Sequence, residues 1–378
     1  MARGPDGSGG GAGFSLADQL FNESTLADLA GEHACLPGFD SDRFLREALG
    51  GLEGRTLLGR LDWIATCVEV QLPAAFPVMV EALRAAMPPE LDPSKTDDDF
   101  GRFIHAVPGI LAVRHGLESH RDLALDLIHD ATKRFSMEFY IRSFLNRWPD
   151  ETLARLDLWA EDENYHVRRL VSEGTRPTLP WAQNIDLDPS VPIRFLDKLH
   201  GDPTRYVTRS VANHMNDLSK IMPDGVVGIL SNWQIAARQD PKELAWMTRH
   251  ALRTAVKRGE RGALDLLGYR AGAVTARLDI PRTVRIGDAL PISVELTSPD
   301  ALPVMVDYRL RFHRPSKPVE KVFKLKTGAL TPDTPQVFVK AHKLKGNAST
   351  FTLHPGPHHL TIQVNGRDVA DARFDLVQ

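Results

Sequence analysis

The stretch "HVRRLVSEG", residues 166–174, decides the expected fold, because its pattern returns twice along the chain, as "YVTRSVANH" from residue 206 and "WMTRHALRT" from residue 246. Arg169, Arg209 and Arg249 occupy the same place in the three copies, at a spacing of forty residues. A period of this length, with two helices in each unit, is typical of HEAT-like solenoids, whose units bury their apolar faces only against neighbouring units. We therefore predict stacked helix pairs, with these arginines along one wall.

The helical pattern extends from Phe14 to about Gly272. In residues 39–73 apolar side chains recur at spacings of three and four, with Asp40 or Ser41 as the N-cap and Pro73 as a stop. Residues 3–13 are too rich in glycine to form a core. We expect a flexible tail over residues 1–13 and a HEAT-like repeat domain over 14–272.

From about Arg277 the period of the apolar pattern changes to two, and turns rich in Pro, Gly and Asn separate the segments. Roughly seven short strands over this length indicate an immunoglobulin-like antiparallel β-sandwich at residues 273–378. Within residues 304–313, Tyr308, Leu310 and Phe312 alternate with basic side chains, which predicts one core face and one basic face. The expected fold class is mainly α, an α-solenoid of HEAT-like repeats, with an all-β C-terminal domain.

Composition is that of an ordinary globular protein: 378 residues, 42% hydrophobic, 25% charged and two cysteines. No apolar run reaches eighteen residues and no signal peptide is evident, so we expect a cytoplasmic protein without a membrane span. The net charge of −3 hides an asymmetry: residues 1–130 hold 10 Lys and Arg against 21 Asp and Glu, whereas residues 301–350 hold 10 against 3. Such a basic region permits a polyanionic partner, although a solvated face would look the same.

Four segments resemble the AlkC-type DNA alkylation-repair glycosylases, a branch of the HEAT-like glycosylases related to the AlkD type. The segments are "TKRFSMEFYIRSFL" from 132, "WAEDENYHVRRLVSEGTRPTLPWA" from 159, "RSVANHMNDLSK" from 209 and "RHALRTAVKRG" from 249. The resemblance runs from about Leu16 to Gly268, and some members of the family carry an immunoglobulin-like domain. It implies a monofunctional DNA glycosylase of base excision repair, acting on double-stranded DNA that contains cationic alkylated bases. The expected lesions are chiefly 3-methyladenine, with 3-methylcytosine and 1-methyladenine as further candidates, removed without extrusion of the base.

A cationic base leaves as a neutral molecule without a general acid, so the remaining chemical task is to stabilise an oxocarbenium-like sugar and admit water, as carboxylates do in glycosidases. Glu173 is the first candidate, because a carboxylate in the last turn of a helix opposes the helix dipole and needs a cation nearby. On spacing alone, an ordinary surface ion pair with Arg169 is favoured. The family resemblance instead implies a catalytic role for Glu173.

Three further residues complete the expected catalytic set. Glu138 is flanked by Phe135, Phe139 and Ile141, which indicates an apolar helix around its carboxylate. It joins Glu173 through the resemblance, although it could equally point outward or bond Arg142 four residues later. Trp181 follows an extended "TLP" and could stand at the cleft, whereas a lone Trp is more often core. Asp217 could position water, bond an arginine or cap a helix end.

Basic and polar side chains around these acids are the expected DNA-backbone contacts, since half or more of protein–DNA hydrogen bonds go to phosphate and sugar. In the helical region they are Arg168, Arg169, Arg176, Arg209, Asn213, Lys220, Arg249, His250, Arg253, Lys257 and Arg258. In the sandwich they are Arg309, Arg311, Lys324, Lys326, Lys343 and Lys345. Some of them could instead brace neighbouring helices or be solvated.

Motifs for nucleotide cofactors, P-loops and metal helices are not found in the sequence, so we expect no cofactor and no metal. We expect a monomer. The competing function is a non-catalytic HEAT-repeat module that binds bent or branched DNA or a protein partner. The two functions differ at the carboxylates, which a pure DNA binder does not need.

Overall fold

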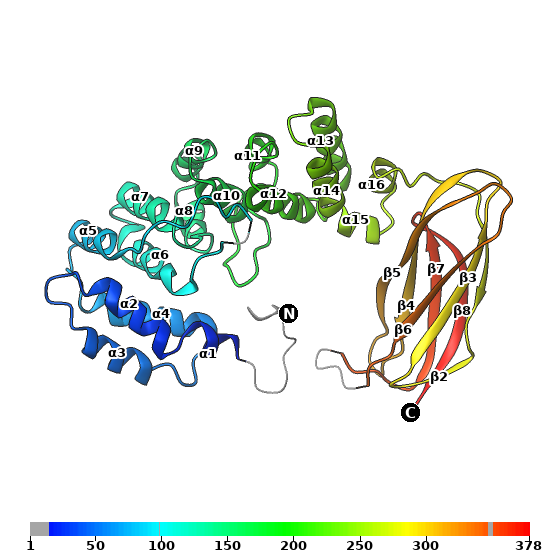
Figure 1. Ribbon diagram of the computed structural model, residues 1–378, viewed down its shortest axis with the longest axis horizontal. Coiled ribbons are helices and arrows are strands. Elements are labelled where there is room, and N and C mark those ends of the chain that lie inside the picture. Colours follow the sequence, from blue (N-terminus) through cyan, green and yellow to red (C-terminus); the bar gives the residue numbers. More distant parts are fainter. Residues whose placement is uncertain (1–14, 98, 347–350) are drawn as a thin grey trace. The chain divides into compact units, whose positions relative to one another are not determined.

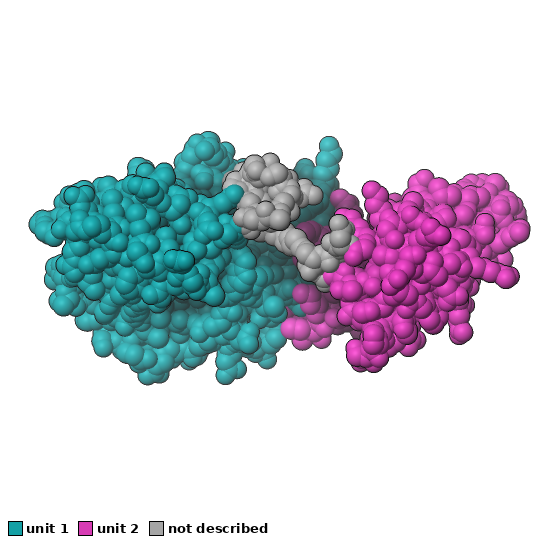
Figure 2. Space-filling view, turned by 90° about the horizontal axis from the view of Figure 1, so that it is seen from below, with its two compact units in different colours: residues 1–217, 238–247 teal, residues 218–237, 248–378 magenta. Residues whose placement is uncertain are grey.

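The computed structural model describes residues 15–97, 99–346 and 351–378 (Figure 1). The chain divides into two compact units (Figure 2). The first holds residues up to 217 together with 238–247, and the second holds residues 218–237 and 248–378. The predicted tail at residues 1–13 lies outside the described residues.

Short helices that follow one another build the first unit (Figure 1). They are α1 (Leu16–Leu20), α2 (Glu23–His33), α3 (Ser41–Gly50), α4 (Leu57–Glu69), α5 (Phe76–Ala86), α6 (Val107–Leu111), α7 (Arg121–Thr132), α8 (Ile141–Arg147), α9 (Pro149–Trp159), α10 (Tyr165–Gly174), α11 (Ile193–Leu199) and most of α12 (Arg205–Leu218) and α14 (Pro241–Ala251). A 3-10 turn, η1 (Phe103–Ala106), precedes α6, and a π turn, η2 (Ala112–Gly116), follows it. Most contacts between helices join elements that are close in the sequence, such as α2 with α3 and α10 with α11.

Local sequence signals explain where these helices begin and end. Asp40 is the N-cap of α3, and its carboxylate accepts a hydrogen bond from the Arg43 amide at 2.9 Å, as predicted. Helix α4 ends at Glu69, four residues before Pro73. The three copies of the forty-residue pattern each contribute to a helix, namely α10, α12 and α14. The helical prediction for this region is confirmed.

The second unit contains helices and strands. Its helices are α13 (Pro223–Ala236), α15 (Arg253–Lys257) and α16 (Arg261–Leu266), with the last residues of α12 and α14. Helix α16 packs on α13. The helices end at Leu266 and the first strand begins at Thr275, so the predicted boundary at 272–273 falls in the linker between them.

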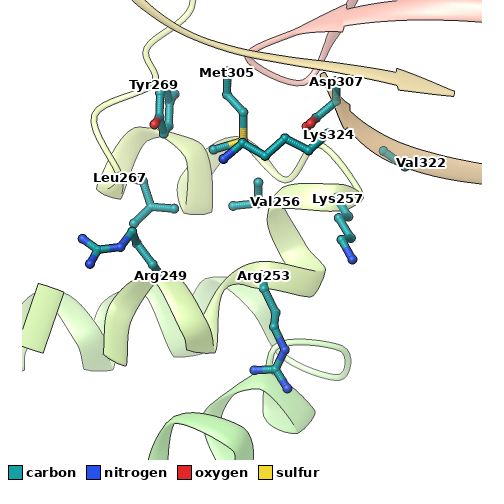
Figure 3. A pocket seen from close by; sticks show the side chains of 10 residues that line it. All are labelled: Arg249, Arg253, Val256, Lys257, Leu267, Tyr269, Met305, Asp307, Val322 and Lys324. Atoms are coloured by element: carbon teal, nitrogen blue, oxygen red, sulfur yellow. The ribbon is translucent and has the colours of Figure 1, made fainter. Parts of the chain in front are cut away.

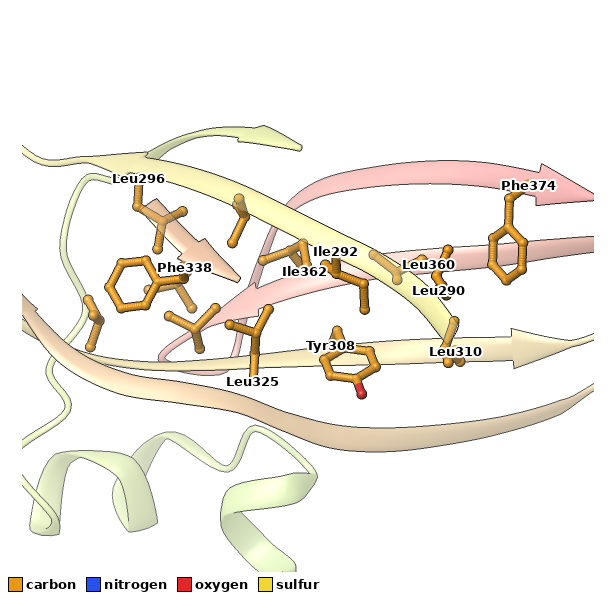
Figure 4. Close-up of a cluster of buried hydrophobic side chains, with 14 of the residues drawn as sticks. Leu290, Ile292, Leu296, Tyr308, Leu310, Leu325, Phe338, Leu360, Ile362 and Phe374 are labelled. Carbon is orange, nitrogen blue, oxygen red and sulfur yellow. The ribbon is translucent and has the colours of Figure 1, made fainter. Parts of the chain in front are cut away.

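The strands form two sheets that face each other across one apolar core (Figure 4). They are β1 (Thr275–Asp279), β2 (Thr283–Arg285), β3 (Ala289–Thr297), β4 (Leu302–Phe312), β5 (Val319–Leu330), β6 (Gln336–Lys343), β7 (Gly356–Val364) and β8 (Arg367–Val377). The sheet orders are β1-β3-β6 and β2-β8-β7-β4-β5. Every pairing is antiparallel except that of β2 with β8.

Strand β4 follows the predicted alternation. Tyr308, Leu310 and Phe312 point into the core and are at most 3% exposed, while Arg309 and Arg311 lie on the other face. The fold class, a helical region followed by an all-β domain, is therefore confirmed. Among the residues that the structure describes, no helix has both the length and the apolar character needed to cross a membrane.

Candidate active site

Helix α10 carries Glu173 in its last turn. Asn164 caps the start of the helix, accepting a hydrogen bond from the His166 amide at 2.9 Å, and the helix ends at Gly174. Glu173 is only 5% exposed, although a carboxylate at this end opposes the helix dipole. The ion pair with Arg169 that spacing favours is therefore present but buried, not at the surface, and a buried carboxylate requires partners.

Two arginines and a serine surround the Glu173 carboxylate. Arg176 Nη1 donates to Oε1 at 2.5 Å, Ser210 Oγ donates to Oε2 at 2.6 Å, and Arg169 Nη2 lies 3.8 Å from Oε2. Burial alone would raise the pKa of Glu173, but the two guanidinium groups and these hydrogen bonds outweigh it and lower that pKa below its usual value. The group is therefore ionised at neutral pH, and the cations that face it belong to the chain itself.

Glu138 lies in the turn between α7 and α8, not within a helix as the sequence pattern indicated. Its Oε2 accepts a hydrogen bond from Arg169 Nη1 at 2.7 Å and another from Ser136 Oγ at 2.8 Å. The alternative bond to Arg142 is wrong, because helix α8 begins only at Ile141 and Arg142 donates to main-chain carbonyls. Arg169 thus contacts both predicted catalytic glutamates.

Asp217 lies in the last turn of α12 and is 4% exposed. Arg176 binds it with two nitrogens, Nε at 2.9 Å and Nη2 at 2.8 Å from the same oxygen Oδ2. Of the roles open to Asp217, the bond to an arginine is observed. The same guanidinium that holds Glu173 therefore also holds Asp217.

These contacts form one chain of alternating charges within the first unit: Glu138, Arg169, Glu173, Arg176 and Asp217. Three carboxylates against two guanidinium groups leave a formal charge of −1 on the five side chains. The Arg169 guanidinium also stacks over the Tyr206 ring, 4.4 Å from its centroid. Residues from three separate segments of the sequence thus meet at one buried electrostatic cluster, which we call the carboxylate–arginine cluster.

Trp181 is 59% exposed, so the core interpretation of this side chain is wrong. It lies in the loop between α10 and α11 and has a φ of 66°, a left-handed conformation that is rare for a bulky residue. Such a backbone persists only where neighbouring contacts enforce it. The ring is therefore presented to solvent by a constrained loop.

Several of the arginines expected to contact DNA hold partners within the protein. Arg168 Nε donates to Asp202 at 2.6 Å, Arg209 lies 3.0 Å from Asp97, and Arg309 Nη2 donates to Asp368 at 2.6 Å. Arg253 Nη1 donates to the His250 carbonyl at 2.5 Å. Asn213, Lys220, His250 and Arg253 also take part in further interactions. To bind phosphate, each of these groups has to share or exchange a partner that it already has.

A cavity of about 370 Å³ in the second unit is lined by residues of its helices and of strands β4 and β5 (Figure 3). Arg249, Arg253 and Lys257 line it from the helices, with their charged ends directed away from Met305 (Figure 3). Asp307 lies at a bulge of β4, where burial raises its pKa to about 6 against the opposing effect of Lys324. The cavity gathers residues from the expected DNA-contact set of both regions.

No group of three or more His, Cys, Asp or Glu side chains suited to a metal ion occurs within residues 15–97, 99–346 and 351–378. One histidine of the C-terminal region, His359, bonds Asp371 at 2.8 Å.

Sequence reasoning missed Ser136, Ser210 and Tyr206 as partners of the cluster. Ser210 is 37 positions from Glu173, and no spacing rule connects a serine to a carboxylate across two helices. Tyr206 had a detectable signal, because it occupies the position in its repeat copy that His166 occupies in the preceding one. Equivalent positions of stacked repeats are neighbours, and the two rings do pack, with centroids 5.3 Å apart.

The chain is similar to known proteins in both sequence and structure. The family model described as the C-terminal Ig-like domain of the uncharacterised protein YhaZ matches residues 274–378. The uncharacterised protein YhaZ of Bacillus subtilis (strain 168) is 28% identical over 361 residues, which are 92% of this chain and 96% of YhaZ. The structure of the Pseudomonas fluorescens alkylpurine DNA glycosylase AlkC, bound to DNA containing an abasic site analog, is similar with a TM-score of 0.84 and 29% identity. That similarity covers 97% of this chain and 100% of AlkC. The resemblance that the sequence motifs indicated is therefore confirmed: the chain is similar to AlkC over 97% of its length, and residues 274–378 match the Ig-like family model.

Proposed function

We propose that this protein is a DNA glycosylase of base excision repair that hydrolyses the N-glycosidic bond of cationic alkylated bases. The similarity to an alkylpurine DNA glycosylase over nearly the whole of both chains supports an enzyme of DNA repair. The substrates we propose are 3-methyladenine, and with it 3-methylcytosine and 1-methyladenine, in double-stranded DNA. The protein acts as a monomer, without a cofactor, in the cytoplasm at the nucleoid.

The observation that carries the proposal is the pair of contacts made by Arg169. Its two terminal nitrogens lie 2.7 Å from Glu138 and 3.8 Å from Glu173, so both acids belong to one site. Asp217 joins through Arg176 at 2.8 Å. A cluster of three acids is unfavourable near a polyanion, and its presence in a protein of this type favours a role at a centre of positive charge.

The chemistry follows from the charge of the substrate. The bond between C1′ and the glycosidic nitrogen, N9 of the adenines or N1 of the cytosine, breaks with its electron pair passing to the cationic base, which leaves neutral, while positive charge develops on the sugar. Water then adds to C1′ and loses a proton. Glu173 and Glu138 stabilise the developing cation electrostatically, and an ionised carboxylate in a site of low polarity contributes several kcal/mol, roughly what one well-placed polar contact contributes in other enzymes.

The arginines of the cluster have a second role in this proposal. They keep Glu173 ionised and hold the carboxylates in position before DNA arrives, so that little reorganisation is needed in the transition state. Trp181, exposed on its loop, packs against the damaged nucleotide, and the pathway does not need the base to leave the helix. The basic side chains of the helices and of the sandwich bind the DNA backbone.

A non-catalytic DNA-binding module is the competing function. A module of that kind gains affinity when acids near the DNA are removed, because each carboxylate repels phosphate. The buried position of Glu173 and the number of its partners favour the enzyme.

The direct test is to incubate the protein with duplex DNA that contains 3-methyladenine and to measure the free base over time. The proposal predicts release well above the spontaneous rate and a product strand that retains an abasic site. Release at the spontaneous rate, from a protein that binds the duplex, would favour the non-catalytic module.

A further inference from the structure

Arg142 is a fully buried arginine outside the carboxylate–arginine cluster. It lies in the first turn of α8 and is the largest side chain with essentially no exposed surface. Helix α8 approaches the end of α10 closely at this point, since a Cβ added to Gly174 would lie 2.6 Å from Ile141 Cγ2. Arg142 therefore sits beside the turn of chain that carries Glu173.

Three main-chain carbonyls accept hydrogen bonds from the one guanidinium group. Nη1 donates to Gly174 O at 3.1 Å and to Arg176 O at 2.8 Å, and Nε donates to Gln183 O at 2.6 Å. The first two carbonyls follow directly on Glu173, and the third lies two residues after Trp181. The two ends of the segment that carries Trp181 are thus joined at one side chain.

Side chains on the exposed side of α8 also bind the loop that follows Trp181. Asn146 Nδ2 donates to Asn184 O at 2.9 Å, and Asn146 Oδ1 accepts from the Asp186 amide at 2.9 Å. Gln183 Nε2 donates to Ser143 Oγ at 2.7 Å. One face of α8 therefore binds residues 183–186 from Arg142 outward to Asn146.

The free-energy cost of burying a guanidinium argues that Arg142 does more than fill space in the core. It forms no ion pair at hydrogen-bond distance, and its Nη2 has no hydrogen-bond partner among the described residues. A buried cation of this kind costs more than an apolar side chain of similar volume. What a guanidinium provides here is a planar set of donors that reaches three carbonyls at fixed angles, which neither Lys nor Met can reproduce.

We infer that Arg142 is a positioning residue, which fixes the loop of Trp181 relative to the Glu173 end of α10. The inference rests on the proposed function for its catalytic consequence, but the effect on the loop is independent of any chemistry. Arg142 orients Trp181, whose strained backbone needs enforcing contacts, and keeps that ring in register with the carboxylates.

The test compares Arg142→Lys, Asn146→Ala and a matched control, Arg147→Lys. Arg142→Lys retains the charge and removes the three-way contact, whereas Asn146→Ala loosens the exposed end of the loop with little risk to folding. Arg147 is on the same helix but pairs with exposed Glu118 at 2.9 Å, and among the described residues it makes no hydrogen bond to the loop. Each protein is labelled with 5-fluorotryptophan, and the fluorine resonance of Trp181 is assigned from its loss in Trp181→Phe.

We expect the Trp181 resonance to shift or broaden in Arg142→Lys and, less strongly, in Asn146→Ala, and to stay in place in Arg147→Lys. With 3-methyladenine duplex under single-turnover conditions, Arg142→Lys should excise about 10-fold more slowly, since small misplacements of reacting groups have effects of this order. Its affinity for undamaged DNA should stay within about two-fold of wild type, because no phosphate contact is removed.

An unchanged Trp181 resonance in folded Arg142→Lys overturns the inference, and so does an unchanged single-turnover rate when the wild type is active. If Arg142→Lys fails to fold, Asn146→Ala decides: an unchanged resonance there equally overturns it. If the wild type releases no base, the proposed function fails while the fluorine spectra still decide the inference about the loop.

Discussion

At the scale of single residues, burial and charge together set the state of the carboxylate–arginine cluster. Glu173 stays ionised because Arg169 and Arg176 outweigh the cost of burial. His214 is buried beside the same cluster, and its Nδ1 lies 3.0 Å from the Ser172 carbonyl, which a neutral ring satisfies by donating. Its Nε2 has no hydrogen-bond partner among the described residues, so protonation there would add an unsolvated charge.

Stability should therefore depend on pH through His214. Burial first, and then Arg176, lower the pKa of His214 to about 4, against the smaller opposing effects of the Ser172 bond, Asp217 and Glu173. A histidine with a lowered folded pKa binds its proton more readily in the unfolded state, so stability falls as pH falls from about 6.5 towards 4. Between pH 7 and 4.5 the wild type should lose about 2 kcal/mol of unfolding free energy that His214→Asn does not lose.

Urea unfolding at several pH values measures this difference. Asn is chosen because its amide can still donate to the Ser172 carbonyl. A gap between the two proteins that stays constant from pH 7 to 4.5 would contradict the assignment of His214 as a buried neutral ring.

At the scale of elements, residues 95–97, between α5 and η1, pack on α10 and α12. The Lys95 carbonyl accepts from Tyr165 Oη at 2.7 Å, the Thr96 carbonyl accepts from the Tyr206 amide at 3.0 Å, and Asp97 pairs with Arg209 at 3.0 Å. Arg209 Nη2 also donates to the Asp97 carbonyl at 2.7 Å. Asp97 thus binds Arg209, an arginine that the repeat pattern predicted to contact DNA phosphate.

Removing the Asp97 charge should tighten DNA binding. In Asp97→Asn the carbonyl bond to Arg209 can remain, while the guanidinium loses its anionic partner and phosphate meets one charge fewer. Partly exposed ion pairs contribute about 0.5–1 kcal/mol, which corresponds to about a two- to five-fold gain in affinity for duplex DNA.

Fluorescence anisotropy with an undamaged duplex at fixed salt provides the measurement. Asp92→Asn is the control, because Asp92 lies in the same segment but, among the described residues, its carboxylate accepts hydrogen bonds from Ser94 alone, at 2.7 and 2.9 Å. Equal affinities of Asp97→Asn and Asp92→Asn would show that Arg209 does not contact the backbone.

The helices and strands also differ from the site in how far their sequence predicts them. The forty-residue spacing and the alternation in β4 are local or periodic, so the helices and the inward-facing side chains of the sandwich could be predicted. The Arg169 bond to Glu138 joins residues 31 positions apart in different segments, and only packing decides it. Apolar neighbours such as Phe135 and Ile141 imitate a helical face, so the sequence pattern predicts a helix at Glu138 where the structure has a turn. Trp181 was undecided because a lone Trp carries no sign of exposure.

At the scale of the whole molecule, the second unit combines the last helices with the sandwich. Arg261 Nη1 donates to the Asn365 carbonyl at 3.3 Å, and Asn365 Nδ2 donates to the Arg270 carbonyl at 2.8 Å. Gly259 lies so close to Gly366 that an added Cβ would be 3.1 Å from its carbonyl oxygen. Helices α15 and α16 therefore depend on the strands for part of their packing.

Truncation after Gly272 should weaken DNA binding and loosen α15 and α16, because these contacts disappear with the sandwich. Hydrogen exchange should show faster exchange at residues 253–266, while the helices of the first unit keep their protection. Unchanged binding and excision in the truncated protein would make the sandwich dispensable for DNA.

The central claim is that acids assembled by arginines act on a positively charged sugar, and Glu173→Gln tests it most directly. Glutamine can keep the Arg176 and Ser210 contacts in part while it removes the charge. Single-turnover release of 3-methyladenine should fall by about 100-fold or more, a loss typical of removing one electrostatic contact to a transition state, with duplex affinity equal to or higher than that of the wild type. A wild-type rate in Glu173→Gln would contradict the account.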